Sequence, residues 1–161
     1  MSKYNSFIKN WCIISIATCI FSYIMWGLMD FETFVGTGLT IEDLCFDIAY
    51  CSFYTLFSLW VSFFLGNIFV RDKISYPRFA THILLLLLAN SVWAVAFENI
   101  FDNLWHAGNN VYWDRLYVFG LIATLLTMVN ACMYYCSILI RKEKENVVLT
   151  NNLLRQQMNP N

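Results

Sequence analysis

Three ionisable residues recur at intervals of four near the end of a long apolar stretch: Glu98, Asp102 and His106. At this spacing their side chains share one face of any helix that continues through residue 106. Two carboxylates and an imidazole can bind a cation, and the imidazole can instead sense pH because it changes charge near physiological pH. Asp114 follows closely, and we predict a sensing site from these four residues. The alternative is the end of a helix at the membrane interface, where the charges are in contact with water.

Two asparagines lie near the midpoints of separate apolar stretches, Asn90 in residues 79–101 and Asn130 in residues 116–140. At similar depth in a membrane they could form a hydrogen bond between helices. Such bonds contribute about 0.6–2 kcal/mol in membranes, which is enough to specify packing. We therefore interpret Asn90 and Asn130 as intramembrane packing residues.

No motif for catalysis is present, whether a Gly-rich phosphate loop, a Ser/His/Asp arrangement or HExxH. The acidic stretch over residues 30–47 could hold a divalent cation, but its ligand spacing is not diagnostic and solvated loop charges are the alternative. We expect no metal site, no catalytic residue and no cofactor in the chain itself. The absence of a basic patch argues against a nucleic-acid partner.

The elements that position these residues are predicted by composition. The chain has 161 residues, of which 59% are hydrophobic and only 13% are charged. Average soluble domains have roughly a quarter charged residues, and a membrane helix needs about 20 mostly apolar ones. Four stretches satisfy this length: residues 11–29, 48–70, 79–101 and 116–140. The sequence therefore predicts an all-α integral membrane four-helix bundle, with a domain over residues 1–140.

Several local signals refine this prediction. Thr40 and Asp43 have the spacing of an N-cap residue and its third helical position, which favours a short interfacial helix over residues 39–46. Pro77 marks the end of a tight loop between the second and third stretches. Trp60 and Trp93 lie in the middle of their stretches, so we expect both to pack between helices.

The charges predict the orientation. Nine of the ten basic residues fall on one side of the predicted membrane, and eight of the eleven acidic residues fall on the other. The eight acids are Asp30, Glu32, Glu42, Asp43, Asp47, Glu98, Asp102 and Asp114. Basic loops stay in the cytoplasm, so both termini are expected there.

The segment over residues 141–161 is predicted to continue the fourth helix into the cytoplasm, because no proline or glycine interrupts it before Pro160. Ile140, Val147 and Leu154 recur every seven residues, which is a weak coiled-coil pattern. The partner positions of this heptad are polar, so a helix in a dimer is favoured over a strong zipper. A solvated amphipathic tail is the alternative.

The last residues of this segment, Leu153-Leu154-Arg155-Gln156-Gln157-Met158-Asn159-Pro160, resemble the start of a phosphoacceptor box. The box belongs to bacterial membrane sensor histidine kinases that are commonly paired with LytTR-type response regulators. It reads N-P-H-F-L-F-N, and the histidine receives the phosphate. The resemblance covers only eight or nine residues, but it lies where that family has the box, just after the last membrane helix.

The chain departs from the family at the next position, where Asn161 replaces the acceptor histidine and the sequence ends. An asparagine amide cannot accept a phosphoryl group as an imidazole nitrogen does. The chain as given should not phosphorylate itself. ATP, Mg²⁺ and a response regulator are implied only for the kinase region that is not in it.

The resemblance implies a homodimeric sensory domain of a two-component histidine kinase, located in the bacterial inner membrane. A stimulus would shift the bundle, and the fourth helix would pass the shift to residues 141–161, a signalling helix and the start of the dimerisation region. The alternative is a small non-enzymatic multi-span protein, either transporter-like or an accessory subunit, with a polar path along Asn90, Glu98 and Asn130.

Overall fold

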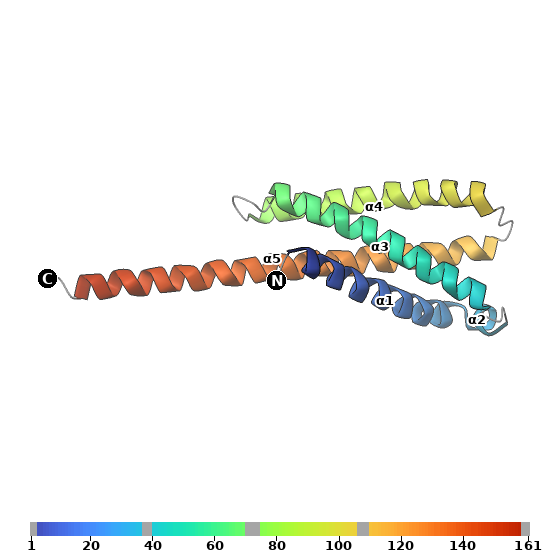
Figure 1. The fold of residues 1–161 in the computed structure, drawn as a ribbon, viewed down its shortest axis with the longest axis horizontal. Coiled ribbons are helices and arrows are strands. Elements are labelled where there is room, and N and C mark those ends of the chain that lie inside the picture. Colours follow the sequence, from blue (N-terminus) through green and yellow to red (C-terminus); the bar gives the residue numbers. More distant parts are fainter. Residues whose placement is uncertain (1–2, 37–39, 70–74, 106–109, 159–161) are drawn as a thin grey trace. The chain divides into compact units, whose positions relative to one another are not determined.

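A computed structural model of the chain describes residues 3–36, 40–69, 75–105 and 110–158 (Figure 1). In this part the chain is helical and contains no strand. Its helices are α1 (Lys3–Met29), α2 (Phe31–Gly36), α3 (Ile41–Phe69), α4 (Tyr76–Trp105) and α5 (Asn110–Met158). Four of these described helices, all except the short α2, are long and apolar enough to cross a membrane. The predictions of an all-α chain and of four candidate membrane helices are therefore confirmed.

The chain divides into two compact units, Met1–Met128 and Val129–Asn161, and α5 contributes residues to both. In the first unit, α3 packs against α1 and against α4 (Figure 1). Ser15 of α1 is hydrogen-bonded to Thr55 of α3, whereas Tyr23, later in α1, is hydrogen-bonded to Asp47, earlier in α3. The two helices are therefore antiparallel. Short connections between consecutive long helices favour this arrangement.

Polar and apolar side chains are distributed in the first unit as a lipid environment requires. Several polar side chains are buried: Ser15, Thr18, Ser22, Asp47, Thr55, Ser58, Ser62, His82, Asn90 and Thr127. Large apolar side chains point outward, and Val92 and Leu121 are 69% and 62% exposed. In water this pattern would expose a large apolar surface, whereas in a bilayer it places hydrocarbon against lipid and hydrogen-bonding groups against one another.

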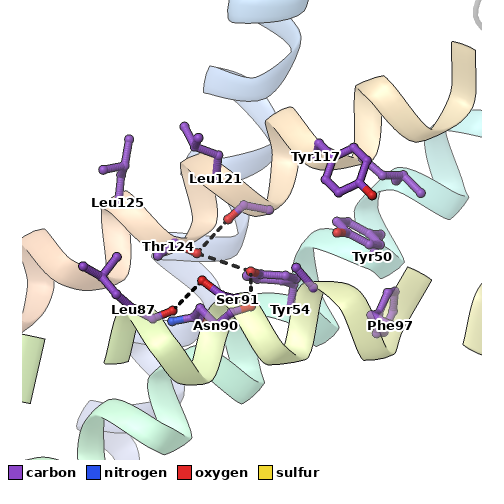
Figure 2. Close-up of a pocket in the computed structure, with 13 residues that line it drawn as sticks. Tyr50, Tyr54, Leu87, Asn90, Ser91, Phe97, Tyr117, Leu121, Thr124 and Leu125 are labelled. Carbon is purple, nitrogen blue, oxygen red and sulfur yellow. Dashed lines mark hydrogen bonds between the residues drawn. The ribbon is translucent and has the colours of Figure 1, made fainter. Parts of the chain in front are cut away.

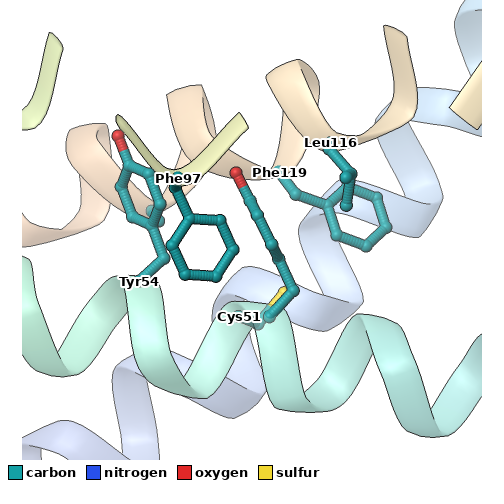
Figure 3. Packing of buried hydrophobic residues seen from close by; sticks show 7 residues of the cluster. Cys51, Tyr54, Phe97, Leu116 and Phe119 are labelled. Atoms are coloured by element: carbon teal, nitrogen blue, oxygen red, sulfur yellow. The ribbon is translucent and has the colours of Figure 1, made fainter. Parts of the chain in front are cut away.

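An aromatic core joins the helices of this unit (Figure 3). Its buried members are Tyr50, Cys51, Tyr54, Phe97, Leu116, Phe119 and Ala123, which come from α3, α4 and α5. Tyr50 and Phe97 make an edge-to-face contact with ring centroids 5.0 Å apart. Tyr23 of α1 contacts Phe119 in the same way at 5.4 Å. Each such pair contributes about 0.5–1.5 kcal/mol beyond its buried area, so the core fixes the register of the helices.

The predicted cap at Thr40 is present. The Asp43 backbone N–H donates to Thr40 Oγ1 at 3.2 Å, and the Thr40 N–H and hydroxyl both donate to Asp43 Oδ2. These reciprocal bonds satisfy donors that the first turn of a helix leaves unpaired. The capped helix is the first turn of α3 itself rather than a separate interfacial helix, so the second membrane helix begins earlier than residue 48.

The two mid-span tryptophans differ in their surroundings. The Trp93 ring stacks on Phe57 with centroids 4.2 Å apart, so the prediction that it packs between helices is confirmed. Trp60 is 58% exposed, and the same prediction is wrong for it. The sequence does not separate the two residues, because large apolar side chains occur both on the exposed side of α3, such as Phe53, and on its packed side, such as Leu59.

Candidate functional site

Three of the four predicted sensing residues lie near the ends of two helices. Glu98 and Asp102 belong to α4, which continues to Trp105, so they are one helical turn apart as predicted. Asp114 belongs to α5. The side chains of these three residues and the whole of His106 lie outside the described part of the structure. The cation site and the pH sensor therefore stay predictions.

Asn90 lies in the middle of α4 and is 2% exposed. Its Nδ2 donates to the Leu86 carbonyl oxygen at 2.9 Å, a bond within its own helix. Its backbone carbonyl oxygen accepts a hydrogen bond from the Tyr54 hydroxyl of α3 at 3.2 Å. Asn130 belongs to the other unit, so a bond between the two asparagines stays a prediction. Asn90 does tie α4 to α3, but through its backbone.

Tyr54 is the centre of a small polar network inside the aromatic core. Its hydroxyl lies 3.2 Å from the Asn90 carbonyl oxygen and 3.3 Å from Thr124 Oγ1 of α5. Thr124 in turn donates to the Gly120 carbonyl oxygen at 2.9 Å. A Cβ at Gly120 would lie 3.3 Å from the Tyr50 hydroxyl oxygen and 3.3 Å from a Tyr54 ring carbon. Glycine therefore allows α5 to approach the two tyrosines closely.

A pocket of about 380 Å³ opens beside this network (Figure 2). Tyr50, Tyr54, Asn90 and Phe97 contribute buried groups to its lining, and Leu121 and Leu125 of α5 are exposed at its rim. The pocket is lined by residues of α3, α4 and α5, and most of its lining is apolar. An apolar lining with a few hydrogen-bonding groups is typical of small-molecule sites.

A buried carboxylate lies between α1 and α3. Asp47 is 0% exposed, and its Oδ2 accepts a short hydrogen bond from the Tyr23 hydroxyl. The charge pattern of the sequence predicts Asp47 among the charges of an outer loop, whereas Asp47 lies inside α3. Composition cannot separate a loop acid from one buried in the first turns of a helix. One feature of the sequence does indicate a buried position for Asp47. It begins a row of polar residues along one side of α3, which continues with Thr55, Ser58 and Ser62.

The α1–α3 interface continues as a row of small polar side chains. Ser15 Oγ and Thr55 Oγ1 are 2.6 Å apart, and Trp11 Nε1 donates to the Ser52 carbonyl oxygen at 2.9 Å. Thr18 and Ser22 continue the row on α1 at 0% exposure. Small residues at this spacing let membrane helices approach closely, and their hydrogen bonds strengthen the contact. We interpret the row as the structural joint between α1 and α3.

The second unit carries the residues that resemble the phosphoacceptor box. Every residue from 139 to 158 is exposed, including large apolar side chains. Val147, Leu153 and Leu154 are 55%, 60% and 51% exposed. Arg141 Nε lies 3.7 Å from Glu145 Oε1, an exposed pair one turn apart that adds only a few tenths of a kcal/mol to the helix.

Among the described residues no group of three or more His, Cys, Asp or Glu side chains could hold a metal ion. No protein family, curated protein or solved structure matches the chain. The function must therefore be inferred from the residues and their arrangement.

Proposed function

We propose that the chain is the membrane sensory domain of a two-component histidine kinase and signals through α5. The observation that carries the proposal is the extent of α5. This single helical element contains the last apolar stretch and also Leu153–Met158, the helical part of the sequence that resembles the phosphoacceptor box. A continuous helix can transmit a rotation or a shift from a membrane domain, whereas a flexible linker cannot.

The exposed apolar residues of α5 support a homodimer as the working form. Val147 and Leu154 are seven residues apart and more than half exposed, and they lie beyond the last apolar stretch. Outside a membrane, such a stripe on a helix is stabilised by pairing with another helix. The partner that fits is the same stripe on a second copy, because the kinases that the tail resembles work as dimers.

We further propose that the protein spans the bacterial inner membrane with both termini in the cytoplasm. The support is the segregation of charge in the sequence, with nine of ten basic residues on the side of the termini. This orientation puts residues 141–161 in the compartment that holds ATP and response regulators. It leaves Glu98, Asp102, His106 and Asp114 near the opposite face.

The proposal is tested by supplying the kinase region. Residues 1–160 are joined to the acceptor histidine and ATP-binding region of a kinase of the resembled class. In membranes supplied with ATP and Mg²⁺, we expect the phosphorylation level of this chimera to differ from that of the kinase region alone by more than about fivefold. About fivefold is the lower end of the effects that typical allosteric coupling free energies produce. Phosphorylation is measured as acid-labile label.

The matched control is the same chimera with asparagine kept at position 161. It should carry no label, because its side chain has no imidazole nitrogen to accept phosphate. A chimera that inserts into the membrane but is phosphorylated to the same level as the kinase region alone would contradict the proposal. In that case the membrane domain would contribute nothing to the output.

A further inference from the structure

The pocket beside Tyr54 carries an inference beyond the sensory role. We propose that it binds a small neutral molecule that is mostly apolar and carries one hydrogen-bond donor, such as a hydroxyl group. The site lies among residues of α3, α4 and α5, within helices apolar enough to cross a membrane. Its ligand would therefore enter from the bilayer.

The described lining disfavours a charged ligand. Among the residues whose side chains the structure describes, none that lines the pocket is Asp, Glu, Lys, Arg or His, and most of the lining surface is apolar. An ion transferred into such a site would lose its hydration without gaining a partner, at a cost of several kcal/mol. An apolar molecule gains the burial of its surface against Phe97 and Leu116 at no such cost.

Two hydroxyl groups of the pocket favour a ligand that carries a hydrogen-bond donor. Each hydroxyl has one proton and two acceptor lone pairs. Ser91 Oγ donates its proton to the Leu87 carbonyl oxygen at 2.9 Å, and Thr124 Oγ1 donates to the Gly120 carbonyl oxygen at 2.9 Å (Figure 2). Each of these two oxygens keeps at least one acceptor lone pair, because the Tyr54 hydroxyl, 3.3 Å from Thr124 Oγ1, can occupy only one of the two on Thr124. A ligand hydroxyl can donate to one of them, whereas a plain hydrocarbon chain cannot.

The volume of the pocket is suitable for a small-molecule ligand. Its volume of about 380 Å³ lies at the low end of the range for ligand sites, roughly 300–1,000 Å³. The exposed residues Tyr117 and Leu121 at the rim, 51% and 62% exposed, place the opening toward the surroundings of the helices. A medium-chain alcohol has the right size, the right polarity and a route through the lipid.

The test uses a photoreactive octanol that carries a diazirine, with the full chain in lipid nanodiscs. We expect saturable labelling of pocket residues, identified by mass spectrometry, that unlabelled octanol displaces. Ser91→Phe places a ring in the pocket and should reduce this labelling more than about tenfold, which corresponds to 1.4 kcal/mol. Val92→Phe is the matched control, because Val92 is the next residue, is 69% exposed and does not line the pocket.

The proposal would be overturned by labelling that is not saturable. It would also be overturned by labelling of Val92 and other exposed residues that is as strong as the labelling of the pocket residues. That pattern is expected of an alcohol that only partitions into lipid. Ala94→Leu, a second filling variant, should repeat the effect of Ser91→Phe if the first variant folds poorly.

A role of this ligand as the stimulus rests on the proposed sensory function, whereas its binding does not. In the kinase chimera, octanol should change phosphorylation in the Val92→Phe protein but not in the Ser91→Phe protein. Saturable labelling without any change in phosphorylation would keep the binding site and refute its role as the stimulus.

Discussion

Inserting one alanine after Lys142 should change the phosphorylation of the kinase chimera by roughly 5- to 150-fold, the range of typical coupling free energies of about 1–3 kcal/mol. One added residue rotates the rest of α5 by about 100° relative to the membrane domain, because an α-helix has 3.6 residues per turn. The rotation moves Val147 and Leu154 away from a partner helix. Alanine is used because it favours helix most strongly.

Inserting seven alanines at the same point is the control for length. Seven residues make almost two full turns and leave a net rotation of only about 20°. They also lengthen the helix by about 10 Å, far more than one residue does. We expect phosphorylation to return close to that of the parent chimera. Equal output from the one-residue, seven-residue and parent proteins would mean that α5 does not transmit the signal mechanically.

Replacing Tyr23 with phenylalanine should destabilise the membrane domain by about 1–3 kcal/mol. The change removes the hydroxyl that donates to Asp47 Oδ2, and the loss of a hydrogen bond to a buried acceptor costs about 1–3 kcal/mol. Asp47 is fully buried, so water cannot replace the lost donor. The free energy of unfolding is measured by titrating the purified protein in mild detergent with dodecyl sulfate while following helical circular dichroism.

Two comparisons separate this effect from a general response to mutation. Ser15→Ala removes a bond between two hydroxyls, and Thr55 keeps its bond to the Cys51 carbonyl oxygen at 2.7 Å. Bonds of this kind in membranes average about 0.6 kcal/mol, so a smaller loss is expected. Tyr134→Phe alters an exposed tyrosine and should stay within about 0.5 kcal/mol of the parent. A Tyr23→Phe protein as stable as the Tyr134→Phe protein would refute the buried bond.

The four candidate membrane helices could be predicted from the sequence because their signal is local. Length and apolar composition identify a membrane helix without any knowledge of its neighbours. The Thr40–Asp43 cap was predictable for the same reason, since both partners lie in one turn. Trp60 and Trp93 show the limit, because two tryptophans of similar depth differ only in which side of the helix faces another helix.

The pocket could not be predicted, because it depends on contacts between distant residues. Tyr54, Asn90 and Thr124 come from three helices, and nothing in their spacing along the chain brings them together. Asn90 was identified for its depth, yet its bond to another helix is made by the backbone carbonyl oxygen rather than by the side chain. The sequence predicts a loop position for Asp47, because it does not show that the hydroxyl of Tyr23 on a neighbouring helix lies within hydrogen-bonding distance.

The pairing of α5 between two copies is the claim on which the sensory account depends most directly. It is measured by placing single cysteines at each position from 143 to 158, in a protein whose six native cysteines are replaced, and oxidising the membranes. We predict disulfide-linked dimers with maxima at Val147, Thr150 and Leu154 and minima at Glu145 and Asn152, a repeat of about 3.5 residues. Uniform cross-linking along the segment, or none at any position, would contradict the account.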